Sequence, residues 1–185
     1  MKKKVIVTGC AGFIGSNLVD LLLKKNFSVL GIDNLSTGHL RNLDDANKNK
    51  NFHFVKLDLL DIKKIKNLFK NIDMVFHLAA NADVRYGIDN PKKDLEQNTI
   101  VTFNILESMR VNGVKKIIFS STGSIYGETS IIPTPENVEF PIQTSFYGAS
   151  KLACEGLIQA YCDHYNFKSW IFRFVSILGE RYSHG

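Results

Sequence analysis

The chain of 185 residues carries 23 Lys and Arg against 18 Asp and Glu, a formal net charge of +5, and 44% of its residues are hydrophobic. This composition is ordinary for a globular protein and excludes intrinsic disorder, a collagen-like chain and a small disulfide scaffold. The length suffices for one well-buried core but is short for two full domains, so we expect a single domain over residues 1–185.

The charge pattern excludes some partners. The lysines stand in small groups with acids among them, and no nucleic-acid-binding motif is recognisable, so no nucleic-acid partner is predicted. No apolar run reaches the roughly 20 residues of a membrane span, so no membrane partner is predicted. The three cysteines form no CxxC pair, which favours reduced thiols and a cytoplasmic location. The histidines do not cluster with Cys or acids at metal-ligand spacing, so no metal is predicted.

Strands and helices are predicted to alternate along the chain. Short apolar runs predict six strands, at Val5–Thr8, Ser28–Ile32, Phe52–Leu57, Asp73–Leu78, Lys116–Phe119 and Ser169–Phe174. Helical patterns cover Phe13–Lys25, Asp61–Phe69, Lys92–Val111 and Ser145–Tyr165. The polar stretch 34–50 is expected on the surface, and 122–143, with three of the four prolines, is expected to be irregular. This alternation predicts an α/β doubly wound parallel sheet, a Rossmann fold, with right-handed crossovers.

A glycine-rich turn joins the first strand to the first helix. Gly9, Gly12 and Gly15 give the pattern GxxGxxG. Such glycines allow a tight turn, a close backbone approach to a pyrophosphate and close packing of helix on strand, and the helix N-terminus offers N–H groups to the anion. A tight turn without a ligand would explain three glycines alone.

An acidic residue makes the dinucleotide interpretation stronger. Asp33 ends the second strand eighteen residues after Gly15, where a carboxylate can accept hydrogen bonds from a ribose 2′-OH and repel a 2′-phosphate. The pattern therefore favours NAD over NADP. His39 and Arg41, just downstream, leave NADP open.

A tyrosine and a lysine four residues apart suggest proton chemistry. Tyr147 and Lys151 fall on one face of the last predicted helix. A nearby ammonium is expected to lower the tyrosine pKa, so that the phenol could take a proton from a sugar hydroxyl as hydride leaves for nicotinamide. The hydroxyls of Ser120, Ser121 and Thr122 end the fifth strand, at the edge where doubly wound sheets bind ligands. Such Tyr–Lys pairs also occur by chance on exposed helices, so the order of the motifs carries the argument.

Taken together, these motifs make the chain resemble the extended short-chain dehydrogenase/reductase family, and within it the NAD-dependent nucleotide-sugar epimerase/dehydratase group. The matching segments are TGCAGFIG, DNLSTG at 33–38, Asp58-Leu59, HLAA at 77–80, Asn98, SSTGSIYG at 120–127 and YGASK at 147–151.

The resemblance implies a role for each matched residue. Thr122, Tyr147 and Lys151 would be catalytic, with Tyr147 as acid/base. The cofactor-binding set would be Gly9, Gly12, Phe13, Ile14, Gly15, Asp33, Asn34, Asp58, Leu59, Leu78, Ala79, Ala80, Asn98, Tyr147 and Lys151. The implied substrate is a UDP-sugar, the implied reaction is epimerisation at C4 of a UDP-hexose through a transient 4-keto intermediate, and a homodimer is expected.

Departures from the family pattern refine these expectations. Dehydratases of the group carry Asp-Glu directly after the catalytic Thr, but here Gly123 and Ser124 stand there, which disfavours water loss. After the sixth strand, Ser176 takes the place of an asparagine that often touches substrate, so the sugar stays open. Family members continue well beyond residue 185, so we expect the cofactor-binding part with most of the C-terminal substrate-binding part missing. Two alternatives stay open, another nucleotide-sugar oxidoreductase or decarboxylase and an NAD-binding module without turnover.

Overall fold

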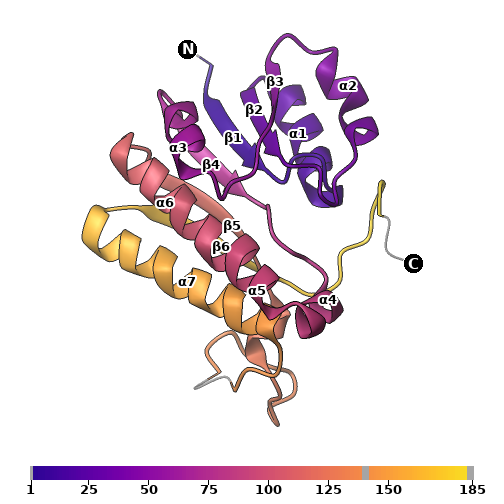
Figure 1. Ribbon diagram of the computed structural model, residues 1–185, viewed down its shortest axis with the longest axis vertical. Coiled ribbons are helices and arrows are strands. Elements are labelled where there is room, and N and C mark those ends of the chain that lie inside the picture. The colour runs from indigo at the N-terminus through magenta and orange to yellow at the C-terminus, as the bar shows by residue number, and fades with distance from the viewer. Residues whose placement is uncertain (1, 139–141, 183–185) are drawn as a thin grey trace.

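The computed structural model describes residues 2–138 and 142–182 and contains one parallel six-stranded sheet (Figure 1). Its strand order is β3-β2-β1-β4-β5-β6, and every neighbouring pair is parallel. The strands are β1 Lys4–Thr8, β2 Ser28–Asp33, β3 Phe52–Lys56, β4 Met74–His77, β5 Lys116–Thr122 and β6 Lys168–Phe174. The predicted fold class is confirmed, and each predicted strand is present within a few residues of its expected ends.

The predicted helices are also present, and local sequence explains their ends. They are α1 Phe13–Lys24, α3 Ile62–Ile65 continued by the 3₁₀ turn η2 Lys66–Phe69, α6 Val101–Val111 and α7 Phe146–Tyr165. Asp61 accepts a hydrogen bond from the Lys64 N–H at the start of α3, and Ser145 caps α7 in the same way. The helix predicted at 92–111 begins earlier, as α5 Pro91–Asp94, and passes through a π-helical segment, η3 Leu95–Ile100, before α6.

Two apolar clusters hold helices against opposite faces of the sheet. Figure 1 shows α1 and α2 (Asp44–Asn47) on one side and α6 and α7 on the other. The larger cluster, on the α6–α7 side, includes Phe69, Ile105, Phe119 and Ile158, all at most 1% exposed. Strands covered on both faces are apolar almost throughout, which is why short β-branched runs were sufficient to predict them.

Within the described ranges, no helix is both long enough and apolar enough to cross a membrane.

One prediction about an irregular segment is wrong in part. The stretch 34–50 is not purely surface, because it forms η1 Leu40–Leu43 and α2, and these bury Leu43 completely and Ala46 to 2% exposure. A short helix, α4 Val84–Asp89, was not predicted. The segment 122–143 is irregular as expected apart from η4 Gly123–Tyr126, and residues 139–141 lie outside the described part of the chain.

The strand order places the site. The chain turns from one half of the sheet to the other between the neighbouring strands β1 and β4. In doubly wound sheets, ligands bind outside the carboxyl ends of the strands at this reversal of strand order. The glycine turn follows β1, Asp33 ends β2 and Thr122 ends β5, so the predicted site residues share that edge.

Candidate active site

The glycine turn is shaped to admit an anion. Gly9 has φ +67°, and a Cβ there would lie 2.8 Å from the Ala79 nitrogen, while a Cβ at Gly15 would collide with the Gly9 carbonyl oxygen. A Cβ at Gly12 would meet only that oxygen, at 3.3 Å, so the outer side of Gly12 is open. Gly12 is also the N-cap of α1, where no side chain caps the helix and no acid stands in the first turn. The N-terminal N–H groups of α1 are therefore available to a phosphate.

Asp33 and its neighbours form the far end of the predicted cofactor site. Asp33 is 8% exposed; its Oδ2 accepts the Ala11 N–H at 2.9 Å and its Oδ1 accepts the Leu35 N–H at 2.8 Å. Asn34 donates from Nδ2 to Asp58 Oδ2 at 3.1 Å, which joins the ends of β2 and β3. The structure thus brings Asp33, Asn34 and Asp58 together, and it adds a second role for Asp33, which ties the glycine turn to β2.

The segment after β4 is fixed to the glycine turn by Thr8. The Thr8 hydroxyl accepts the Leu78 and Ala79 N–H groups, at 3.1 and 3.2 Å, and lies 2.8 Å from His77 Nδ1. Because this hydroxyl has one proton to give, it donates to Nδ1, and the proton on Nε2 then goes to Thr102 Oγ1 at 3.0 Å. Complete burial lowers the His77 pKa to about 3, with the Lys151 charge adding to the effect, so the imidazole is a neutral structural link.

The three predicted catalytic residues meet at the end of β5. Thr122 ends that strand, and Tyr147 lies in the first turn of α7 within hydrogen-bonding reach of Thr122. Lys151, one turn further on, is 2% exposed, and its Nζ donates to the Ser120 carbonyl oxygen at 2.8 Å. The Thr122 hydroxyl also accepts the Ser124 N–H at 3.1 Å, which starts η4.

Lys151 was expected to lower the pKa of Tyr147, and the structure does not show this effect. The pKa of Tyr147 is raised, mainly because the phenol is buried, and the hydrogen bond with Thr122 only partly offsets this. Lys151 Nζ lies 6.0 Å from the centroid of the Tyr147 ring and is directed to the β5 backbone. Burial also lowers the pKa of Lys151 itself to about 8. In this structure Thr122, and not Lys151, is the side chain that acts against the effect of burial on the Tyr147 pKa.

Asn98 is buried in a polar network that was not predicted. Its Nδ2 donates to Ser150 Oγ at 2.8 Å and its Oδ1 accepts the Asn81 N–H at 2.8 Å. Asn81 donates in turn to Asp94 Oδ1 at 2.8 Å. The side chain of Asn98 thereby joins η3, the segment after β4 and α7, and Ser150 passes the link to the Tyr147 carbonyl oxygen at 2.8 Å.

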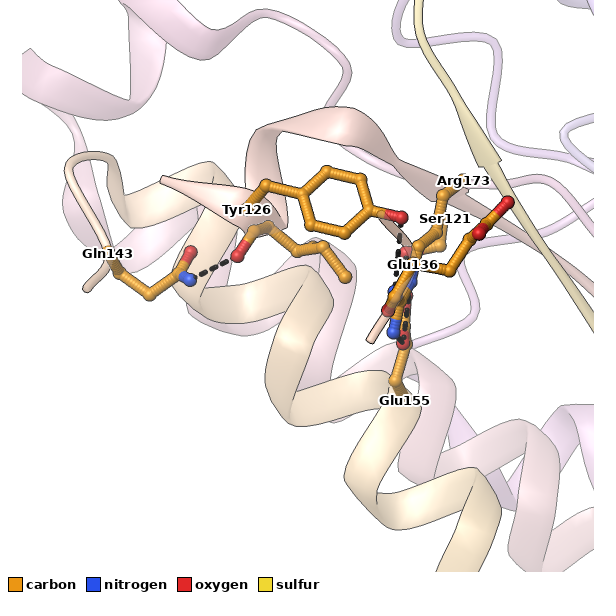
Figure 2. Close-up of polar contacts among 7 residues, drawn as sticks. Ser121, Tyr126, Glu136, Gln143, Glu155 and Arg173 are labelled. Atoms are coloured by element: carbon orange, nitrogen blue, oxygen red, sulfur yellow. Dashed lines mark hydrogen bonds and ion pairs between the residues drawn. The ribbon is translucent and has the colours of Figure 1, made fainter. Parts of the chain in front are cut away.

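A second polar group adjoins the three predicted catalytic residues, and of its members only Ser121 was expected near the site. Glu155 of α7, Arg173 of β6 and Ser121 of β5 converge beside Tyr126 (Figure 2). One signal was present in the sequence, because Glu155 follows Tyr147 and Lys151 at intervals of eight and four residues, on the same helix face. Among the described residues, no group of three or more His, Cys, Asp or Glu side chains is placed to hold a metal ion.

Comparison with protein families gives a match over nearly the whole chain. The sequence profile of the NAD dependent epimerase/dehydratase family matches residues 5–185. The chain is 39% identical over 167 residues to a UDP-glucose 4-epimerase of Mycolicibacterium smegmatis, an alignment that covers 88% of this chain and 52% of that protein.

Solved structures agree with this match. A UDP-N-acetylglucosamine 4-epimerase from Methanobrevibacter ruminantium, in complex with UDP-N-acetylmuramic acid, superposes with a TM-score of 0.87 at 36% identity, covering 94% of this chain and 55% of that one. A UDP-glucose 4-epimerase of Thermus thermophilus, in complex with NAD, gives 0.83 at 37% identity, covering 92% and 54%. The chain thus spans about half the length of the relatives it matches.

Proposed function

Because the chain belongs to the NAD-dependent epimerase/dehydratase family, we propose that this protein epimerises a UDP-hexose at C4. The observation that carries the proposal is the shared sheet edge: an open glycine turn stands at β1, and Thr122, Tyr147 and Lys151 meet at β5 and α7. NAD is the cofactor of the family, and the residues present fit it, since the outer side of Gly12 is open and α1 has no side-chain cap.

The residues divide the cofactor site into three parts. Gly12, Phe13, Ile14 and Gly15 would hold the pyrophosphate, with the N-terminus of α1 directed at its charge. Asp33 and Asn34 would hold the adenosine ribose, and Asp58 and Leu59 the adenine. The segment Leu78, Ala79 and Ala80 would lie along the cofactor toward the nicotinamide, and Thr8 holds it by accepting the Leu78 and Ala79 N–H groups. Asn98 would hold the next residue of this segment by accepting the Asn81 N–H.

The proposed chemistry moves one hydride and one proton. NAD, when bound, would supply a reversible hydride acceptor for C4, and return of the hydride to the opposite face of that carbon would invert it. As the C4–H bond breaks, the proton of the C4 hydroxyl passes to the Tyr147 oxygen, and Thr122 holds the reacting sugar oxygen by hydrogen bonding. The return step reverses both transfers. Tyr147 must be ionised to begin, so its raised pKa has to be lowered by the positive charges of the bound cofactor and of Lys151.

Absence of carboxylates beside Thr122 supports epimerisation over dehydration. Gly123 and Ser124 occupy the two positions after Thr122 and form the start of η4. Neither can act as the acid or the base that loss of water from the sugar requires. A keto sugar formed here would therefore be reduced again and not dehydrated.

A panel of UDP-sugars tests the proposal. Protein expressed from the complete reading frame is incubated with NAD and UDP-glucose, UDP-galactose or their N-acetyl analogues, and the products and the cofactor are analysed. We expect interconversion of one C4 pair without accumulation of NADH. Accumulating NADH would instead identify an oxidoreductase or a decarboxylase, and uptake of NAD with no conversion would identify a binding module.

We also propose that the protein forms a homodimer through α6 and α7, as the resemblance implies. The two helices pack side by side (Figure 1), and apolar side chains stay exposed along them, among them Phe103 at 42%, Val111 at 50% and Tyr165 at 42%. Sedimentation equilibrium tests this, with Phe103→Asp expected to give a monomer. A monomeric wild-type protein contradicts it.

A further inference from the structure

An ion pair between a buried carboxylate and a partly exposed guanidinium lies beside the residues proposed as catalytic. Glu155 is 2% exposed and sits on α7 four residues after Lys151. Arg173 Nη2 donates to Glu155 Oε2 at 2.9 Å and Arg173 Nε donates to Oε1 at 3.2 Å, a two-pronged contact. The Ser121 hydroxyl donates to the same Oε1, so β5, α7 and β6 meet at one carboxylate (Figure 2).

The remaining nitrogen of the guanidinium reaches the turn after the catalytic threonine. Arg173 Nη1 donates to the Tyr126 hydroxyl at 3.1 Å and to the Glu136 carbonyl oxygen at 2.7 Å. Tyr126 ends η4, the turn that begins directly after Thr122, and in Figure 2 its hydroxyl points at the cluster of Arg173 and Glu155.

Thr122 is consequently held from both sides. The residue before it, Ser121, is bonded to Glu155, and the turn after it is bonded through Tyr126 to Arg173. Glu155 belongs to the same helix as Tyr147, so its bond to Ser121 also sets how far α7 can slide along β5. The fork of an arginine can hold these partners at fixed angles, which a single-point cation such as lysine cannot.

Net stability is a weak explanation of the pair. Taking the Glu155 carboxylate and most of the Arg173 side chain out of water costs free energy that their attraction offsets only in part, and apolar replacements of similar volume are often neutral or stabilising. What an apolar pair would lack is direction, because apolar contacts do not fix Ser121 and Tyr126 at set angles.

We propose that Glu155 and Arg173 are positioning residues that set Thr122 and Tyr147 at reacting distance from one sugar oxygen without touching it. The inference rests on the proposed function, since the alignment matters to turnover only if these two groups act on substrate. A displacement of about 1 Å at such groups can cost about 100-fold in rate.

A double replacement separates positioning from stability. Glu155→Leu with Arg173→Met removes both charges and keeps the volume. We expect the melting temperature and the NAD affinity to stay near wild type, KM to change by less than about threefold, and kcat to fall by about 10- to 100-fold. Wild-type kcat in the folded double variant would overturn the proposal.

Two single variants complete the design. Ser121→Ala deletes one hydroxyl and is expected to fold, so it keeps the test decisive if the double variant does not fold; we expect kcat to fall several-fold with KM kept. Arg110→Met is the matched control, because Arg110 makes a similar contact with Glu107, at 2.8 and 2.9 Å, on α6 and not at the end of β5. It should leave kcat unchanged, and an equal loss in this control would overturn the proposal.

A spectroscopic readout does not depend on turnover. Tyrosine is labelled with carbon-13 at Cζ, and the Tyr147 signal is assigned from Tyr147→Phe. We expect this signal to move in the double variant and in Ser121→Ala but not in Arg110→Met, and an unmoved signal would overturn the proposal. If the wild-type protein turns over no UDP-hexose, the proposed function fails while this signal still decides whether the pair positions Tyr147.

Discussion

Lys151 donates its hydrogen bond to the Ser120 carbonyl oxygen, so strand β5 anchors the ammonium that the proposed chemistry needs beside Tyr147. The same strand carries Thr122 two residues later, so β5 supports both Lys151 and Thr122. A displacement of β5 relative to α7 would therefore move Thr122 relative to Tyr147 and Lys151.

Gly12→Ala and Gly15→Ala should separate cofactor binding from stability. A Cβ at residue 12 has only one close neighbour, at 3.3 Å, and would fill the space proposed for the pyrophosphate. For Gly12→Ala we expect the NAD dissociation constant to rise about tenfold or more, which corresponds to about 1.4 kcal/mol, and the melting temperature to change little. A Cβ at residue 15 collides with the Gly9 backbone, so that variant should lose about 1–3 kcal/mol of stability. Calorimetry and urea unfolding distinguish the two, and equal effects on both properties would contradict the assignment.

Asp33→Asn should weaken NAD binding more than NADP binding. The carboxylate already accepts two backbone N–H groups, so Asp33→Ala would also loosen the glycine turn, and the amide variant keeps one acceptor in place. Loss of a charged acceptor for a ribose hydroxyl is worth about 1.5–3 kcal/mol, or roughly 10- to 150-fold in NAD affinity. Titration calorimetry with both cofactors measures the ratio. An unchanged preference would mean that Asp33 serves the turn alone.

Tyr147→Phe should lower kcat by about 100-fold or more while the NAD dissociation constant changes little. The hydroxyl is the proposed proton acceptor, and general acid–base catalysis contributes about 10²- to 10⁴-fold. Assays of epimerisation and of NAD binding on the same preparation check this. Parallel loss of both would identify the phenol as a structural or cofactor-binding group.

The parts of this site that the sequence predicts are those with local patterns. Gly9, Gly12 and Gly15 stand at fixed intervals on one turn, and Tyr147 and Lys151 on one helix, so backbone geometry alone places them together. Glu155 and Arg173 were not predicted as partners because they are 18 residues apart in the sequence and lie on different elements, α7 and β6. A charged residue is also ordinarily expected at the surface.

The lack of a recognisable local pattern also explains why the short helices were not predicted. Helix α4 is only six residues long and contains Gly87, so it shows too little of a helical period to be recognised. The turn η1 and helix α2 have mostly polar sequences, and Leu43 and Ala46 become buried only when they pack near α1.

His77→Gln should remove an acid-sensitive part of the stability. Glutamine can accept from Thr8 and donate to Thr102 as the neutral imidazole does, but it does not titrate. The folded-state pKa of His77 is about 3 against an ordinary 6.5, so below pH 6.5 the unfolded chain binds a proton that the folded chain does not. Between pH 7 and pH 5 the wild-type protein should lose about 2 kcal/mol more than the variant. Urea unfolding at the two pH values measures this, and identical losses would contradict it.

Lys151→Met should make the protein less sensitive to alkaline pH. Burial lowers the folded-state pKa of Lys151 to about 8 from 10.5, so between these values the unfolded chain holds a proton that the folded chain has released. The unfolding free energy of the wild-type protein therefore gains up to about 3 kcal/mol relative to the variant as pH rises from 7.5 to 10.5. Below pH 8 the buried charge is a cost, and the variant should be the more stable protein there. Urea unfolding across this range gives the difference, with Lys116→Met on the exposed side of β5 as the control. A difference that stays constant with pH would mean that the ammonium is more strongly stabilised than the Ser120 carbonyl and Glu155 can account for.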